Sequence, residues 1–178
     1  MTKIAMLASR LGDIPMITNE KAVKAKSRDF FWYSPILKEQ LDQITAEAVV
    51  VPRTEAEVVI TLAACFELDI PVTPRGGGTG NYGQAMPLKG GVVLDLSRMD
   101  VITKIEPGRL TCQPGALMGQ IDLRARAESG QELRMHPSTL ETATIGGFIA
   151  GGSGGVGSIR FGLLFEPGNI RRLRIATL

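Results

Sequence analysis

The chain has 178 residues, of which 44% are hydrophobic, and a formal net charge of +2 at pH 7. This length fits one substantial domain or two small lobes, and the charge is too small to indicate a nucleic-acid partner. A single histidine and two cysteines without metal-ligand spacing exclude a histidine-based metal site within this chain, so we expect no bound metal.

The first residues carry charges and lack the continuous apolar core of a secretory signal. No apolar run reaches the length that a membrane-spanning helix needs. Because the two cysteines also give no disulfide framework, the sequence predicts a reduced, cytoplasmic protein without a membrane span.

Residues 1–45 are expected to form an N-terminal helical segment, in which Asn19 caps a helix from Glu20 to Lys26. A buried strand is then predicted at Ala48–Val51.

The next helix is expected to begin with Thr54 and Glu57, which have the spacing of a capping box. Its apolar side is predicted from the helical period. The residues expected on that side are Val58, Val59, Leu62, Ala63, Cys65, Phe66 and Leu68.

A glycine-rich loop, residues 74–83, follows the strand-like run Ile70–Thr73. Glycines let the backbone turn sharply and remove the Cβ atoms that would keep a ligand away. Several N–H groups can then point in one direction and bind anionic oxygen, above all phosphate. The loop therefore predicts a nucleotide or dinucleotide cofactor.

The loop also contains the G-x-G-x-x-G fingerprint, at Gly78, Gly80 and Gly83, and Asp95 ends a later strand, where a ribose-binding acid would be expected. That fingerprint needs a helix directly after the glycines, whereas Pro87 and two further glycines interrupt residues 84–91. An NAD-type dinucleotide-binding protein is therefore the third and weakest function that we consider. A P-loop is excluded, because no Gly-Lys-Ser/Thr follows any glycine run.

The remaining elements follow from periodicity and from turn residues. Strand, helix, strand, loop and strand make a small α/β lobe with a parallel crossover in the first part of the chain. The later elements are a strand at Gly91–Leu96, a hairpin of Val101–Glu106 and Arg109–Gln113 around Pro107–Gly108, a helix at Ala116–Ser129 ended by Gly130 with Leu117, Ile121 and Leu123 facing inward, and a strand at Arg171–Thr177.

A second glycine-rich segment covers residues 143–162 and follows His136–Thr139. Glycine and serine tracts are often flexible linkers, but large apolar side chains recur along this one. They are Ile145, Phe148, Ile149, Val156, Ile159 and Phe161. A solvated linker does not need them, so we expect a buried backbone surface packed closely against a flat group.

Taken together, the two segments resemble the FAD-binding domain of the vanillyl-alcohol oxidase type, also called the PCMH-type flavin domain. The resemblance covers the chain from about residue 47 to the C-terminus and is nearest to the flavin dehydrogenases of glycolate and D-lactate type. It rests on the order and spacing of Glu47–Pro52, Thr54–Val58, Val72–Thr79, Gly91–Met99, Pro137–Ser138, Thr144–Gly147, Ile159–Gly162 and Asn169–Ile175.

The resemblance implies an α+β fold in two lobes, with FAD extended between them. Residues 46–178 would form this domain. The first lobe, a small α/β unit, would take about 46–100, and the second, a mostly antiparallel sheet with flanking helices, about 101–178. The second lobe would be incomplete, because the chain stops before the cap domain in which relatives place substrate-binding and catalytic groups.

By position, the resemblance implies that the first loop surrounds the diphosphate through backbone amides, with a hydroxyl from Thr79. The second segment would support the diphosphate, ribityl chain and flavin ring, and Ile175 would bind the adenine through its main chain. The implied cofactor-binding residues are Pro74, Arg75, Gly76, Gly77, Gly78, Thr79, Gly80, Asn81, Gln84, Pro137, Ser138, Thr139, Thr144, Gly146, Gly147, Gly151, Gly152, Gly154, Gly155 and Ile175.

Non-covalent FAD is expected as well. Some relatives attach the flavin through a histidine at the position of Thr79 and others through a cysteine in the second glycine segment. A threonine cannot form the histidyl bond, and residues 143–162 contain no cysteine.

The implied function is that of an FAD-dependent oxidoreductase, which oxidises a small-molecule substrate, a 2-hydroxy acid or similar alcohol, by hydride transfer to the flavin. No catalytic residue is identified, and the fragment alone is expected to be inactive. An incomplete sheet exposes an edge, which predicts self-association or a partner chain. The alternative is a non-catalytic remnant or a partner-dependent FAD-binding module.

Overall fold

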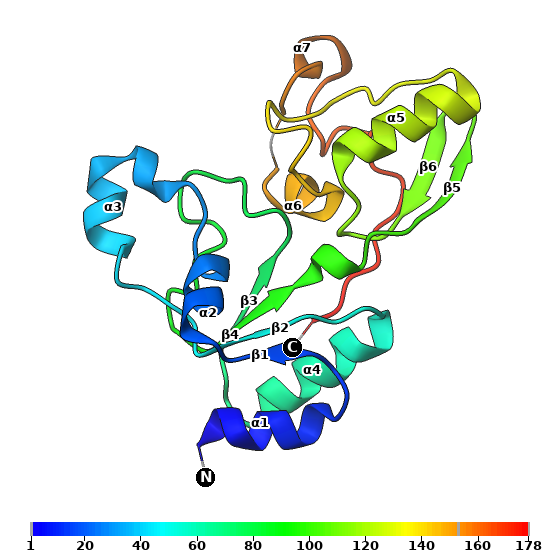
Figure 1. Cartoon of the computed structure of the whole chain (residues 1–178). Coiled ribbons are helices and arrows are strands. Elements are labelled where there is room, and N and C mark those ends of the chain that lie inside the picture. Colours follow the sequence, from blue (N-terminus) through cyan, green and yellow to red (C-terminus); the bar gives the residue numbers. More distant parts are fainter. Residues whose placement is uncertain (1, 153, 178) are drawn as a thin grey trace. The chain divides into compact units, whose positions relative to one another are not determined.

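The computed structural model describes residues 2–152 and 154–177. They divide into two compact units, one of residues 2–98 with 176–177 and one of Met99–Ile175. Figure 1 labels the helices and strands of both units. No helix in the described part of the chain is long and apolar enough to cross a membrane.

The first unit is built on a four-stranded sheet in the order β1-β2-β4-β3. Strands β2, β4 and β3 are parallel, and β1 pairs antiparallel with β2. The strands are β1 (Met16–Ile17), β2 (Ala48–Val50), β3 (Val72–Arg75) and β4 (Val92–Asp95). This topology confirms the parallel crossover that the sequence predicts.

Helices cover both faces of this sheet, which is why β2 and β4 are apolar at almost every position instead of alternating with polar residues. Ala48, Val50 and Val92 face a core shared with α1 and α4, and Val49 and Val93 face a core that includes α2. Figure 1 shows α1 and α4 side by side below the sheet. The helices of the unit are α1 (Lys3–Leu11), α2 (Glu20–Lys26), α3 (Pro35–Leu41) and α4 (Glu55–Glu67), with a 3-10 turn η1 at Phe31–Tyr33 and another, η2, at Leu96–Arg98.

The helix starts confirm two predicted caps. The Asn19 side chain accepts the N–H of Ala22, and Thr54 accepts the N–H of Glu57 at 3.2 Å. The capping box is only half formed, because the Glu57 carboxylate accepts the N–H of Arg53 at 2.6 Å instead of that of the capping residue.

The buried side of α4 differs from the prediction. Val59 and Phe66 are 58% and 70% exposed, so the predicted apolar side of the helix coincides only in part with the side that is buried. Thr61 and Ala64 are buried instead. The Thr61 hydroxyl donates a hydrogen bond to the Glu57 carbonyl at 2.7 Å. This internal bond lets a polar side chain take a core position.

The second unit begins with the predicted hairpin, formed by β5 (Ile102–Glu106) and β6 (Arg109–Cys112). Helix α5 (Met118–Ser129) packs against β5, and Gly130 ends it in the left-handed conformation, as predicted. Ile121 is fully buried, but Leu123 is 65% exposed, and Met118 takes the core position instead.

Two short helices follow, α6 (Ile145–Ala150) and α7 (Ser158–Phe161), and both lie in the second glycine-rich segment. The predicted strand at Arg171–Thr177 is wrong, because residues 171–177 form no regular element. The alternation of Leu173 and Ile175 with arginines has the period of a strand. A strand also needs a neighbour to pair with, and both apolar side chains are exposed here.

Candidate cofactor-binding site

The first glycine loop leaves the sheet at the carboxyl end of β3 (Figure 1). Strand β3 extends two residues beyond the predicted strand, so Pro74 and Arg75 belong to it, with Arg75 opposite Asp95 of β4. The loop proper therefore begins at Gly76. Loops at the carboxyl ends of parallel strands are the usual ligand sites of α/β sheets.

The backbone of this loop is open to a ligand. Among the described residues, no protein group accepts a hydrogen bond from the N–H groups of Gly77 to Asn81. Gly78 has a φ of +64°, which turns the chain so that consecutive N–H groups can converge. Five successive donors without a protein acceptor, next to solvent, suit a diphosphate.

At several glycines of the loop, an added Cβ atom would have to displace a neighbouring side chain. A Cβ atom on Gly78 would overlap the guanidinium of Arg75, and one on Gly80 would lie 2.5 Å from Oε1 of Gln84. Gln84 in turn accepts the N–H of Tyr82 at 3.0 Å. Gln84, one of the predicted binding residues, thus stabilises the turn that ends the loop.

The side chain of Arg75 turns inward. Its Nη1 donates to the carbonyl of Arg28 at 2.5 Å, and its Nε is buried without a hydrogen-bond partner. Burial lowers the pKa of this guanidinium, while the charges of Asp95 and Asp29 act in the opposite direction. Arg75 can therefore offer its backbone to a ligand, but its charge is held by the protein.

Asp95 is not available to a ribose. It is 2% exposed, and its carboxylate binds Nζ of Lys26 at 2.6 Å and the N–H of Ser97 at 3.0 Å. Residues 76–91 also contain no helix. The dinucleotide fingerprint needs a helix directly after the glycines and an acid that is free to bind the ribose. Neither is found in the described residues 76–95, so the NAD-type alternative loses its support.

In the second unit, Gly146 and Thr144 serve the backbone of α6. The Gly146 N–H donates to the Pro114 carbonyl at 2.9 Å, and a Cβ atom on Gly146 would lie 2.8 Å from that oxygen. Thr144 is buried and its hydroxyl accepts the N–H of Gly147. Both predicted residues thus fix the position of α6, and their predicted contact with the cofactor stays a prediction.

Two parts of the predicted second segment are brought together. His136 and Val156 exchange backbone hydrogen bonds of 3.2 and 2.8 Å, so Pro137 and Ser138 lie beside Gly155. A Cβ atom on Gly155 would overlap the His136 carbonyl oxygen. Thr139 continues this strip, and its carbonyl accepts the N–H groups of the turn that leads to α6.

Gly151 and Gly152, at the end of α6, are exposed, and Gly154 is half-buried. Ser153, which lies within the predicted stretch 151–155, is outside the described residues. The segment is not a linker, since it contains two helices, but only part of its apolar set is buried. Phe148 is in the core, whereas Val156 and Ile159 are exposed. The expected packing of this backbone against a flat group stays a prediction.

Ile175 lies in the irregular C-terminal stretch and is 74% exposed. Its predicted main-chain contact with adenine stays a prediction. His136, the single histidine, has Nδ1 3.2 Å from the Pro137 carbonyl. Within the described residues no cluster of three or more potential metal ligands exists.

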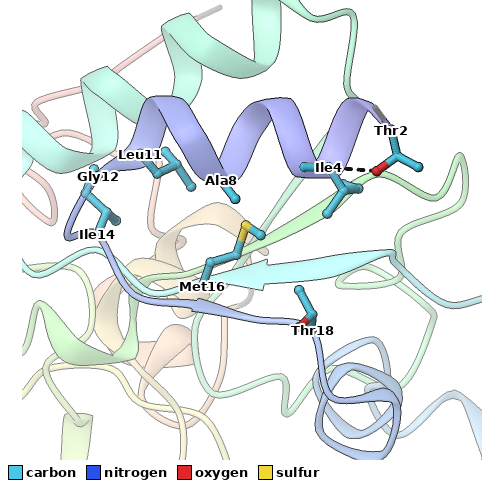
Figure 2. Close-up of a pocket in the computed structure, with 9 residues that line it drawn as sticks. Thr2, Ile4, Ala8, Leu11, Gly12, Ile14, Met16 and Thr18 are labelled. Carbon is cyan, nitrogen blue, oxygen red and sulfur yellow. Dashed lines mark hydrogen bonds between the residues drawn. The ribbon is translucent and has the colours of Figure 1, made fainter.

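A separate hollow in the first unit offers no chemistry. It has a volume of about 540 Å³ and lies between α1 and the segment leading into β1 (Figure 2). Its walls are apolar or uncharged, with Ile4, Leu11, Ile14 and Met16 among them. No titratable side chain lines it, so it is no candidate for a catalytic centre.

Sequence reasoning missed Asp29, which is 4% exposed, and the inward role of Arg75. No spacing rule relates the two residues, and only the charge of a residue followed by four consecutive aromatics could have drawn attention to Asp29.

Comparison with known proteins agrees with this geometry. A family model described as "FAD binding domain" matches residues 46–177. The glycolate oxidase subunit GlcD of Bacillus subtilis is 35% identical over 123 residues, which are 68% of this chain and 26% of that protein. The D-lactate dehydrogenase of Archaeoglobus fulgidus is 38% identical over 117 residues, 65% of this chain and 26% of that protein.

The chain thus spans about a quarter of the length of these curated relatives. Among solved structures, alkyldihydroxyacetonephosphate synthase matches 84% of this chain and 31% of its own with a TM-score of 0.71 at 20% identity. Chitooligosaccharide oxidase matches 89% of this chain and 32% of its own, with a TM-score of 0.68 at 19% identity. These likenesses confirm the fold class.

Proposed function

This chain belongs to the FAD-binding-domain family of FAD-linked oxidoreductases, and from that premise we propose that it is the FAD-binding part of an enzyme that oxidises a 2-hydroxy acid or similar alcohol. FAD is the cofactor of the family. The substrate class is suggested by the names of the relatives, a glycolate oxidase subunit and a D-lactate dehydrogenase. Residues 46–178, in two lobes divided near residue 100, are the proposed flavin domain.

The observation that carries the proposal is the row of N–H groups from Gly77 to Asn81, which have no acceptor among residues 2–152 and 154–177. We propose that these amides bind the FAD diphosphate, with the Thr79 hydroxyl as an additional donor. Backbone dipoles fixed in advance bind an anion without the entropy cost of ordering long side chains. The inward Arg75 side chain leaves the approach to these amides free.

In the second unit, the strip of Pro137, Ser138 and Thr139 beside Gly155 is proposed to contact FAD. Backbone without bulky side chains lets a flat ring approach closely. The exposed glycines Gly151 and Gly152 have the same property. When bound, FAD supplies the hydride-accepting chemistry, and the protein supplies position and exclusion of water.

We propose that the FAD is dissociable, because Thr79 cannot form a histidyl bond and residues 143–162 contain no cysteine. The experiment is an absorbance spectrum of the purified chain, followed by denaturation and ultrafiltration. A yellow protein that releases all of its flavin on denaturation supports the proposal. Flavin that stays with the denatured chain refutes dissociable binding.

The alternatives give different results in the same preparation. A non-catalytic remnant is colourless and shows no thermal shift on addition of FAD. An NAD-type protein is stabilised by NADH and not by FAD.

Turnover is proposed for the longer protein and not for residues 1–178 alone. Small-molecule oxidation needs a base for the hydroxyl proton and a cation for the carboxylate, and no such pair is assigned here. Flavin bound to the chain is therefore expected to stay oxidised when glycolate or D-lactate is added without oxygen. Bleaching of the flavin absorbance would contradict this.

Self-association through an exposed sheet edge and a cytoplasmic location complete the proposal. Sedimentation at high protein concentration tests the first, and a strictly monomeric species counts against it. The two cysteines, which are not bonded to each other, are compatible with a reducing compartment.

A further inference from the structure

A cluster of four charged residues lies beneath the first glycine loop: Lys26, Asp29, Arg75 and Asp95. Asp29 and Asp95 are 4% and 2% exposed. Such burial of carboxylates is rare unless each is paired. Asp29 also precedes the stretch that matches the family model, residues 46–177.

Asp95 has its own partners in Lys26 and in the N–H of Ser97. Asp29 does not: its Oδ1 accepts the N–H of Phe31 at 2.9 Å, but its Oδ2 is buried without a hydrogen bond. The Nε of Arg75 is buried in the same way. These two groups carry opposite charges. No ion pair within 4 Å joins them among the described residues, but the carbonyl of Arg28, next to Asp29 in the chain, accepts Nη1 of Arg75, so both charges lie in one buried cluster and the charge of Asp29 acts on Arg75. Their opposite signs offset part of the cost of burying each.

The segment around Asp29 is tied to the glycine loop at two points. The Arg28 carbonyl accepts Nη1 of Arg75 at 2.5 Å, and the N–H of Phe30 donates to the Gly80 carbonyl at 2.8 Å. The Arg75 guanidinium also occupies the space directly against Gly78. The loop is thus supported from below by the arginine and held from the side by residues 28–30.

We propose that Asp29 is a positioning residue, which holds the Arg75 guanidinium under the loop and so keeps the loop amides directed at the FAD diphosphate. The inference rests on the proposed function, because it assigns those amides to the diphosphate. It adds a residue that touches no cofactor, lies outside the family-matched stretch and acts through another side chain.

The first test is the sign of the change in FAD affinity. Asp29→Asn removes a negative charge near a bound anion, and charge alone would then tighten binding. Positioning predicts the opposite, at least a tenfold weaker binding of FAD. Asp42→Asn is the matched control: it removes the same charge and breaks the ion pairs of Asp42 with Arg28 and Lys38, and it is expected to change FAD affinity less than threefold.

A second test needs no FAD. Trypsin must take an arginine side chain into its specificity pocket, so an Arg75 held under the loop resists cleavage after residue 75. Asp29→Asn is expected to open this site while the protein stays folded by circular dichroism, and Asp42→Asn is not. The two experiments test different claims. If the wild type does not bind FAD, the proposed function is wrong. The trypsin experiment still tests the role of Asp29, because it needs no FAD.

If Asp29→Asn does not fold, the double variant Asp29→Asn/Arg75→Met removes both charges and the cost of leaving one unpaired. It is expected to fold and to bind FAD at least tenfold more weakly than the wild type. The inference is overturned by a folded Asp29→Asn that binds FAD as tightly as the wild type and resists trypsin after Arg75, or by a double variant with wild-type affinity.

Discussion

Replacing Gly78 by alanine is the sharpest perturbation of the proposed diphosphate loop. Gly78 has a φ of +64°, and a Cβ atom added there would overlap the half-buried Arg75 guanidinium. The substitution therefore strains the backbone and displaces the arginine at once. Since the loop is partly open to solvent, we expect it to rearrange locally while the rest of the unit stays folded.

The size of the effect follows from two contributions. A non-glycine residue in the left-handed region costs about 1–2 kcal/mol. Displacing Arg75 loses the hydrogen bond of a charged group to the Arg28 carbonyl, worth about 1.5–3 kcal/mol. A combined effect of about 3 kcal/mol on the binding-competent loop corresponds to roughly a hundredfold weaker FAD binding, since about 1.4 kcal/mol is a factor of ten.

The assay is titration of the apoprotein with FAD, followed by flavin fluorescence, with circular dichroism to confirm folding. Gly108→Ala is the matched control: Gly108 also has a positive φ, +75°, but its Cβ atom would meet nothing within 4 Å, and it lies in the β5–β6 turn. It should lower stability by about 1–2 kcal/mol and leave FAD affinity unchanged. A folded Gly78→Ala with wild-type affinity would refute the loop assignment.

Three further predictions concern other parts of the chain. Gly155→Ala puts a Cβ atom against the His136 carbonyl at a φ of +64°, so it should break the His136–Val156 bridge and lower both the melting temperature and FAD affinity; unchanged values of both would contradict the role of this strip. Burial raises the pKa of the Cys65 and Cys112 thiols to about 11, so iodoacetamide at pH 8 should modify the folded protein far more slowly than the urea-unfolded one, and equal rates would be the contrary result. Burial alone would raise the pKa of Asp95, but Lys26 and Ser97 lower it below its usual value. The stabilising contribution of the Asp95 carboxylate is therefore present above about pH 4 and is lost as the pH falls through the folded-state pKa. In a plot of the urea midpoint against pH, Asp95→Asn should have a shallower slope in this acid range than the wild type. An equal slope in the two proteins would contradict this contribution of Asp95.

The parts of the fold that sequence predicts well are those in which local pattern and tertiary structure agree. The β5–β6 hairpin has its turn residues at Pro107–Gly108, and α5 ends at Gly130, where only a residue tolerant of positive φ fits well. Strands β2 and β4 are short apolar runs, and such runs are typical of a parallel sheet covered on both faces.

The prediction for residues 171–177 was wrong, and that for the apolar side of α4 was wrong in part, because the local sequence pattern was compatible with more than one structure. Helix α4 is apolar on most of its circumference, so its period could not say that Val59 and Phe66 would be exposed and Thr61 buried. The stretch 171–177 alternates like a strand but lacks a ladder partner in the described chain. Pairing depends on residues distant in sequence, which periodicity does not reveal.

For the candidate site, glycine content was enough to point to both loops, because backbone exposure is a local property. The support beneath the first loop was not predictable in the same way. Asp29 and Arg75 come near each other only after the chain has folded through helices α3 and α4 and strand β2, and the inference depends on the burial of both groups and on the bonds from residues 28–30 to Arg75 and Gly80.

The most direct test of the central claim is equilibrium titration of the purified 178-residue chain with FAD, compared with the same titration of Gly78→Ala and Gly108→Ala. We expect saturable binding of one FAD per chain, roughly a hundredfold weaker in Gly78→Ala and unchanged in Gly108→Ala. A folded wild-type chain that shows no saturable binding, or equal affinity in all three proteins, would contradict the assignment of this loop to the flavin cofactor.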